Sequence, residues 1–110
     1  MVSQARVFFE PIKTIAAAAI MSSYVNVGSA TAYPIRGFKI SNNTKGDMMF
    51  TIATSVDQIF VAAGAFTLYD LQSNINPKKD DSFVLPVGTQ FKVKKITDPT
   101  SGDIYIECFY

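Results

Sequence analysis

The chain offers few side chains with which to build a catalytic centre. It contains no histidine and a single cysteine, Cys108. The lack of histidine excludes a histidine general base, a Ser/His/Asp triad and an imidazole metal site, and one cysteine cannot form a disulfide within the chain. Alternation along the C-terminal segment places Cys108 on the same face as Ile104 and Ile106. We therefore expect a buried, unreactive thiol.

The acidic residues offer two candidate sites, and the spacing supports neither. Asp70, Asp80 and Asp81 carry the oxygen ligands that Ca²⁺ prefers, but their spacing matches no EF-hand loop. A solvated turn beside two lysines explains the Asp80–Asp81 pair. Asp57 has no second group at a defined offset with which to act as an acid or base, so a turn or cap role explains it. The sequence therefore predicts a protein that is not an enzyme and that holds no cofactor or metal.

The basic residues do not predict a nucleic-acid interface. Lys92, Lys94 and Lys95 follow one another along a predicted strand, where lysines commonly protect an edge from pairing. Ten Lys and Arg against nine Asp and Glu give a net charge of +1, far from the concentrated positive surface that nucleic acid selects. The apolar run at residues 15–21 is too short to span a bilayer. We expect no direct nucleic-acid recognition and no membrane partner.

The pattern of turns and strand formers predicts an all-β protein. Gly, Pro, Asn and Asp recur about every 8 to 12 residues, which is typical of short strands in a sandwich or barrel. The segments between them are rich in Val, Ile, Thr, Phe and Tyr. With 110 residues, 48% of them hydrophobic, the chain suits one core. We predict a single β domain over residues 1–110, an antiparallel β-sandwich or partly closed barrel of about seven or eight strands, with residues 1–11 as an extended N-terminal arm.

Three local predictions accompany this fold. Residues 42–47 contain Asn, Gly and Asp and predict a hairpin loop, and residues 98–103 predict a second hairpin that leads into the C-terminal strand. Residues 12–22 contain four consecutive alanines, which favour helix, but a proline precedes them and the continuation favours an extended chain. We expect an extended segment there, with one short helix as the alternative.

Aromatic residues exceed what one small core needs. The chain has nine Phe and five Tyr in 12.1 kDa. The C-terminal strand is apolar on both faces, which predicts a central strand or one at an interface. Some rings therefore face a partner, the alternative being a well-filled core with ordinary surface tyrosines. The residues predicted to make contacts between subunits lie at the termini or on second faces: Phe8, Phe9, Tyr24, Tyr105, Phe109 and Tyr110. The loop at residues 73–81 is the next candidate.

Four stretches together resemble a known family. They are YPIRGFKISNNT at 33–44, FTLYDLQSN at 66–74, LPVGTQFKVK at 85–94 and PTSGDIYIE at 99–107. This pattern, over roughly residues 12–110, resembles small virion structural proteins of tailed bacteriophages. At residues 54–57 the chain has Thr-Ser-Val-Asp where the family usually has an Asp-Gly turn, so we expect a different turn there.

The resemblance implies a virion component with a compact β-fold and no catalytic residues to transfer. Such a protein is made in the host cytoplasm, is a homo-oligomer or present in many copies, and binds other virion proteins, either the major capsid protein or connector subunits. Two positions compete: a capsid auxiliary or decoration protein, and a ring at the head-to-tail connection. The near-neutral charge favours the shell over a channel that passes DNA. A hypothesis from a different class is a carbohydrate-binding β-sandwich that uses exposed Tyr with loop Asp and Asn.

Overall fold

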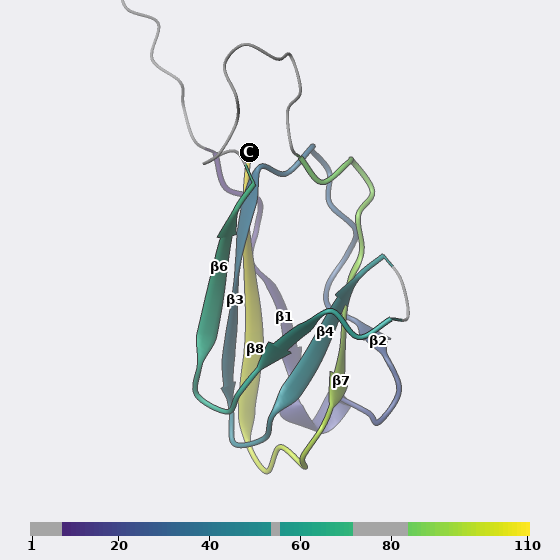
Figure 1. Cartoon of the computed structure of the whole chain (residues 1–110), viewed down its shortest axis with the longest axis vertical. Coiled ribbons are helices and arrows are strands. Elements are labelled where there is room, and N and C mark those ends of the chain that lie inside the picture. The colour runs from purple at the N-terminus through teal and green to yellow at the C-terminus, as the bar shows by residue number, and fades with distance from the viewer. Residues whose placement is uncertain (1–7, 54–55, 72–83) are drawn as a thin grey trace, which may run out of the picture.

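The computed structural model describes residues 8–53, 56–71 and 84–110, which form two packed antiparallel sheets (Figure 1). Sheet A has the strand order β1-β8-β3-β6, and sheet B has the order β2-β7-β4-β5. These eight strands confirm the all-β prediction, in the form of a sandwich. The bounds are β1 Lys13–Ala16, β2 Val25–Asn26, β3 Gly37–Thr44, β4 Met48–Ile52, β5 Ile59–Val61, β6 Phe66–Asp70, β7 Phe91–Lys95 and β8 Gly102–Phe109.

The core lies between the two sheets and is built by strand alternation. Phe38 of β3 meets Phe91 of β7 edge to face, with ring centroids 5.1 Å apart. Phe50 of β4 and Ile106 of β8 are fully buried beside them. Cys108 is also buried in this core, which confirms the prediction from alternation. Inward side chains therefore come from every second residue of the long strands.

β8 is a central strand of sheet A, as its two apolar faces predict. It pairs with β1 on one side and with β3 on the other, and Ile106 lies opposite both Lys13 and Ile40. Its inward residues are buried, whereas Tyr105, Glu107 and Phe109 are half-buried on the outer face. β8 therefore positions both the core and the outer surface of sheet A.

Both predicted hairpins are wrong. β3 pairs with β6 and β8, whereas β4 pairs with β5 and β7, so residues 45–47 cross from sheet A to sheet B. β7 and β8 also belong to different sheets, and residues 96–101 cross between them. Figure 1 shows both crossings at the same end of the sandwich. They contact each other there, because the Asp47 N–H donates to Thr97 Oγ1 at 2.7 Å and Ile96 N–H donates to Asp47 O at 2.9 Å.

Asn42 explains why the first crossing is not a hairpin. The sequence pattern places this residue in the turn, but it lies within β3 with its side chain fully buried. Its amide donates to the carbonyl oxygens of Gly46 at 2.9 Å and Val61 at 3.0 Å. The side chain thus ties the crossing to the end of β5 and directs the chain toward sheet B.

The extended segment expected for residues 12–22 is found only in part. β1 covers Lys13–Ala16, and a single 3-10 turn, η1, covers Ala17–Ala19. Ala is a weak strand former, which is consistent with the strand ending among the alanines. Within the described residues, no helix has the length and apolarity needed to cross a bilayer.

The beginning of the described chain is paired with its end. Phe8 and Tyr110 exchange two backbone hydrogen bonds of 2.9 and 2.8 Å, and Glu10 N–H donates to Cys108 O at 3.0 Å. Residues 8–10 thus continue sheet A beside β8. The remainder of the predicted arm, residues 1–7, lies outside the described residues, as do residues 72–83, which include the 73–81 loop.

Candidate functional site

The outer face of sheet A brings together side chains from three neighbouring strands. Because Ile106 and Cys108 point into the core, Glu107 and Phe109 point outward from β8. The register places Glu107 opposite Lys39 of β3, and Lys39 in turn opposite Leu68 of β6. Glu107, Lys39 and Leu68 therefore form one row across the sheet.

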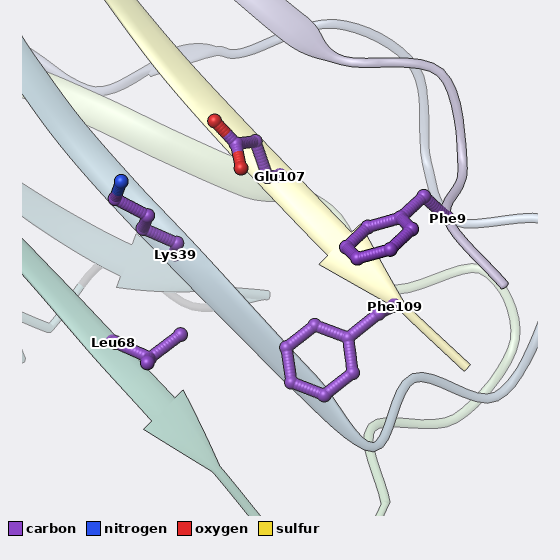
Figure 2. Close-up of a pocket in the computed structure, with 5 residues that line it drawn as sticks. All are labelled: Phe9, Lys39, Leu68, Glu107 and Phe109. Carbon is purple, nitrogen blue, oxygen red and sulfur yellow. The ribbon is translucent and has the colours of Figure 1, made fainter. Parts of the chain in front are cut away.

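A groove of about 240 Å³ lies on this face (Figure 2). It is lined by Phe9, Lys39, Leu68, Glu107 and Phe109. Figure 2 shows the two phenylalanine rings at one end of the groove and the charged side chains of Lys39 and Glu107 at the other. The rings have centroids 6.0 Å apart and a tilt of 54°. Phe9 is 66% exposed and Leu68 is 59% exposed, so the groove is an apolar surface open to solvent.

The position of Phe109 depends on a glycine in the neighbouring strand. Gly37 of β3 lies opposite Phe109, and a Cβ atom added at Gly37 would overlap the Phe109 ring. The ring therefore occupies the space that a side chain on β3 would fill. This close packing holds one wall of the groove in place.

Further apolar side chains extend the groove into a wider patch. Phe66 of β6 is 65% exposed, and Lys39 Nζ lies 4.8 Å from the centroid of its ring. Ile12, which precedes β1, is also exposed, and alternation places it on the same side as Thr14 and Tyr105. We call the five residues Phe9, Ile12, Phe66, Leu68 and Phe109 the sheet A patch.

The six predicted contact residues divide among three places. Phe9 and Phe109 line the groove, and Tyr105 lies half-buried on the same face. Phe8 and Tyr110 stack on each other at the end of sheet A, with ring centroids 5.7 Å apart. Tyr24 lies away from the others, in contact with Lys94 of sheet B. The prediction missed Lys39, Leu68 and Glu107.

A second group of aromatic side chains stacks at the C-terminal end of β8. Tyr110 lies between Phe8 and Tyr33, and its ring is 4.1 Å from that of Tyr33 with only 12° between their planes. Burial is the main cause that raises the pKa of the Tyr110 phenol, and its hydrogen bond with Tyr33 raises the pKa further. The stack fastens residues 8–10 to the end of β8.

Asp57 has two partners that the local sequence does not reveal. Its carboxylate accepts a hydrogen bond of 2.5 Å from the Tyr24 hydroxyl and lies 2.8 Å from Lys94 Nζ. The neighbouring Lys94 ammonium lowers the pKa of Asp57, and burial is the main cause that raises the pKa of Tyr24 to about 12. Tyr24 and Lys94 thus both pair with the Asp57 carboxylate at the surface of sheet B.

Cys108 is buried, and the acidic side chains of the described residues form no cluster that could hold a metal ion. Burial raises the pKa of Cys108 to about 11, so its thiol is protonated at neutral pH. In residues 8–53, 56–71 and 84–110, no three His, Cys, Asp or Glu side chains converge in a way that would hold a metal ion. The sheet A patch combines a groove with several exposed apolar side chains.

Comparison with protein-family models, curated proteins and solved structures finds no match to this chain. The function is therefore inferred from the residues and from the geometry of the sheet A patch.

Proposed function

We propose that the chain is a non-enzymatic structural component of a tailed-phage virion, which joins its assembly through protein contacts made by the sheet A patch. The groove formed by Phe9, Leu68 and Phe109 carries the assembly part of this proposal, because it leaves large apolar side chains in solvent. Contiguous exposed patches of this kind are typical of protein interfaces. The resemblance of four sequence stretches to small virion proteins supports the phage setting.

The energy available from this patch favours assembly in many copies. Phe9, Ile12, Phe66 and Leu68 are each more than half exposed. Burial of each side chain would contribute about 1 kcal/mol, or roughly 4 kcal/mol together. Association of two proteins costs about 4–15 kcal/mol in lost translational and rotational freedom. One such contact is therefore weak, and repeated contacts on a shell or ring supply the avidity that stabilises it.

The partners in this proposal are other virion proteins. On a capsid the partner is the major capsid protein, and in a head-to-tail ring it is a connector subunit. The groove carries one cation, Lys39, and one anion, Glu107, beside its apolar wall. The net charge of the chain is only +1, which supports contact with a protein shell rather than with DNA.

Purified particles of the phage that encodes this chain provide the test. We expect the chain to remain with the particles through density-gradient purification, at a fixed ratio to the major capsid protein measured by quantitative mass spectrometry. We also expect genes for portal, terminase or capsid proteins beside its own gene. Complete loss of the chain from intact particles would contradict the proposal.

The carbohydrate-binding hypothesis receives less support from the described residues. It requires an exposed tyrosine beside polar groups that are available to a sugar. The Tyr24 hydroxyl instead donates a hydrogen bond to Asp57, which also pairs with Lys94. Tyr33 and Tyr69 are 47% and 40% exposed, but the Tyr33 ring stacks on Tyr110 and the Tyr69 ring contacts Phe38. Saturable binding of the purified chain on a glycan array, together with absence from particles, would favour this alternative.

A further inference from the structure

The described edge strands differ in how they are protected from pairing with other strands. β2 has two residues and β5 has three, so both are too short to form a stable ladder. β1 carries Lys13 pointing into the core and follows Pro11, and an inward charge and a proline both oppose edge pairing. β6, Phe66–Asp70, has five residues and contains no lysine, proline or glycine. Its one charged residue, Asp70, is its last, so β6 is the least protected edge among the described strands.

Among the described strands, β6 has a partner only on its β3 side, and its other side presents the backbone of Phe66 and Leu68. At the two ends of the β3–β6 ladder, Asn42 N–H donates to Ala65 O at 2.9 Å and Leu71 N–H donates to Arg36 O at 2.8 Å. Residues of an antiparallel strand alternate in the direction of their backbone groups. Ala65, Leu71 and the odd residues between them therefore bond to β3. The N–H and C=O groups of Phe66 and Leu68 point away from β3, toward the open edge.

The charges beside β6 fit a second copy of the same strand. Lys39 Nζ lies over the Phe66 ring, which places a positive charge near the start of β6. Asp70, which also interacts within its own chain, places a negative charge at the end of β6. In an antiparallel pair centred on Leu68, the Lys39 end of each copy lies beside Asp70 of the other. A parallel pair would place like charges together. Two copies of β6 therefore bring opposite charges together only when the strands pair antiparallel.

We propose that β6 pairs antiparallel with β6 of a second copy, with Leu68 opposite Leu68, so that the two A sheets become one continuous sheet. The two Phe66 and two Leu68 side chains then extend the sheet A patch across the dimer. This inference goes beyond the proposed function, because it concerns the purified chain alone.

The size of the contact sets the strength that we expect. Five residues at about 3.4 Å each give a ladder of roughly 17 Å. Such a contact buries a few hundred Å² per copy, less than the ~800 Å² per partner of a typical stable complex. The dimer is therefore weak in dilute solution and forms as the concentration approaches about 1 mM, which corresponds to roughly 4 kcal/mol of binding free energy.

Sedimentation equilibrium of Leu68→Lys and Phe60→Lys tests the proposal. Lysine at position 68 places like charges directly opposite each other at the dimer axis and also protects the edge. Phe60 is a matched control, since it is 54% exposed on β5, an edge of sheet B. We expect the wild-type chain to dimerise between micromolar and millimolar concentration, L68K to associate at least tenfold more weakly, and F60K to match wild type within twofold. A wild-type chain that stays monomeric at 1 mM, or L68K that associates as wild type does, would overturn the proposal.

Cysteine cross-linking tests the register. The native Cys108 is buried, so a cysteine introduced at the surface is the reactive thiol under mild oxidation. We expect Leu68→Cys to form disulfide dimers at least tenfold faster than Phe60→Cys, and Phe66→Cys to cross-link to Asp70→Cys when the two variants are mixed. Equal rates of disulfide formation by Leu68→Cys and Phe60→Cys would contradict pairing at β6. Because these assays use purified chain, their failure is distinct from absence of the protein from particles.

Discussion

Replacement of Asn42 by alanine is expected to lower the free energy of unfolding by about 4 kcal/mol. The Asn42 amide donates to the carbonyl oxygens of Gly46 at 2.9 Å, Val61 at 3.0 Å and Ala62 at 3.3 Å. Its carbonyl oxygen accepts from the N–H of Thr44 at 3.0 Å and from the Thr44 hydroxyl at 2.6 Å. Alanine makes none of these bonds, and buried groups left unpaired cost about 1–3 kcal/mol each. Part of this cost is relieved, because Gly46 O still accepts from the Thr44 hydroxyl at 3.0 Å and Ala62 O still accepts from the Ala65 N–H at 3.0 Å.

Urea denaturation measures this loss, and Asn43→Ala is its control. Asn43 is the next residue in β3 but is exposed, so its replacement is expected to change the unfolding free energy by less than about 0.5 kcal/mol. A domain of this size has a total stability of about 5–15 kcal/mol, so the Asn42→Ala protein is expected to be marginally folded. Similar midpoints for the two variants would show that the Asn42 hydrogen bonds do not hold the crossing between the sheets.

The buried Glu10–Lys13 pair gives the second large effect. Glu10 Oε1 lies 3.6 Å from Lys13 Nζ, and both side chains are buried. Glu10 Oε2 also accepts hydrogen bonds of 3.1 Å from the backbone N–H groups of Ala32 and Tyr33. Glu10→Ala leaves the Lys13 charge buried without its partner, which is expected to cost about 3–5 kcal/mol of unfolding free energy.

A double substitution separates the buried charge from the other contacts of Glu10. Replacement of a buried pair by apolar residues of similar size is often close to neutral, so Glu10→Ala/Lys13→Met is expected to be more stable than Glu10→Ala. The matched control is Asp98→Ala, which removes the 2.7 Å ion pair with Lys95 at a position that is 82% exposed. Water screens that pair, so little change is expected. If Glu10→Ala and Asp98→Ala have the same urea midpoint, the buried pair does not stabilise the fold.

Local sequence patterns predict the fold class and much of the core. Alternation identifies the buried faces of β7 and β8, because a strand beside a core repeats every second residue. It does not predict the crossings between the sheets. Asn42 is typical of turns by its residue type, yet its partner Val61 lies 19 residues further along the chain. Hydrogen bonds of that kind are not visible in a local pattern.

The candidate site is predicted only in part for a similar reason. Phe9 and Phe109 are identified because they lie near the termini and on a second apolar face. Leu68 and Lys39 join them only through the strand order β8-β3-β6, which no local pattern specifies. The spacing of Phe66 and Leu68 is the signal for an outward apolar face on β6. Buried charges such as Lys13 are also missed, because lysine is rarely buried unless it is paired.

Competition between variants for places in the virion tests the central claim, that the sheet A patch joins the chain to its assembly. Host cells supply wild-type chain together with either Phe9→Ser or Phe60→Ser, and mass spectrometry compares the variant-to-wild-type ratio in purified particles with that in the lysate. Phe9 and Phe60 are 66% and 54% exposed on opposite sheets, so each variant loses one exposed ring. We expect Phe9→Ser to be depleted at least tenfold from particles and Phe60→Ser to enter as wild type does. Equal entry of the two variants would contradict the claim.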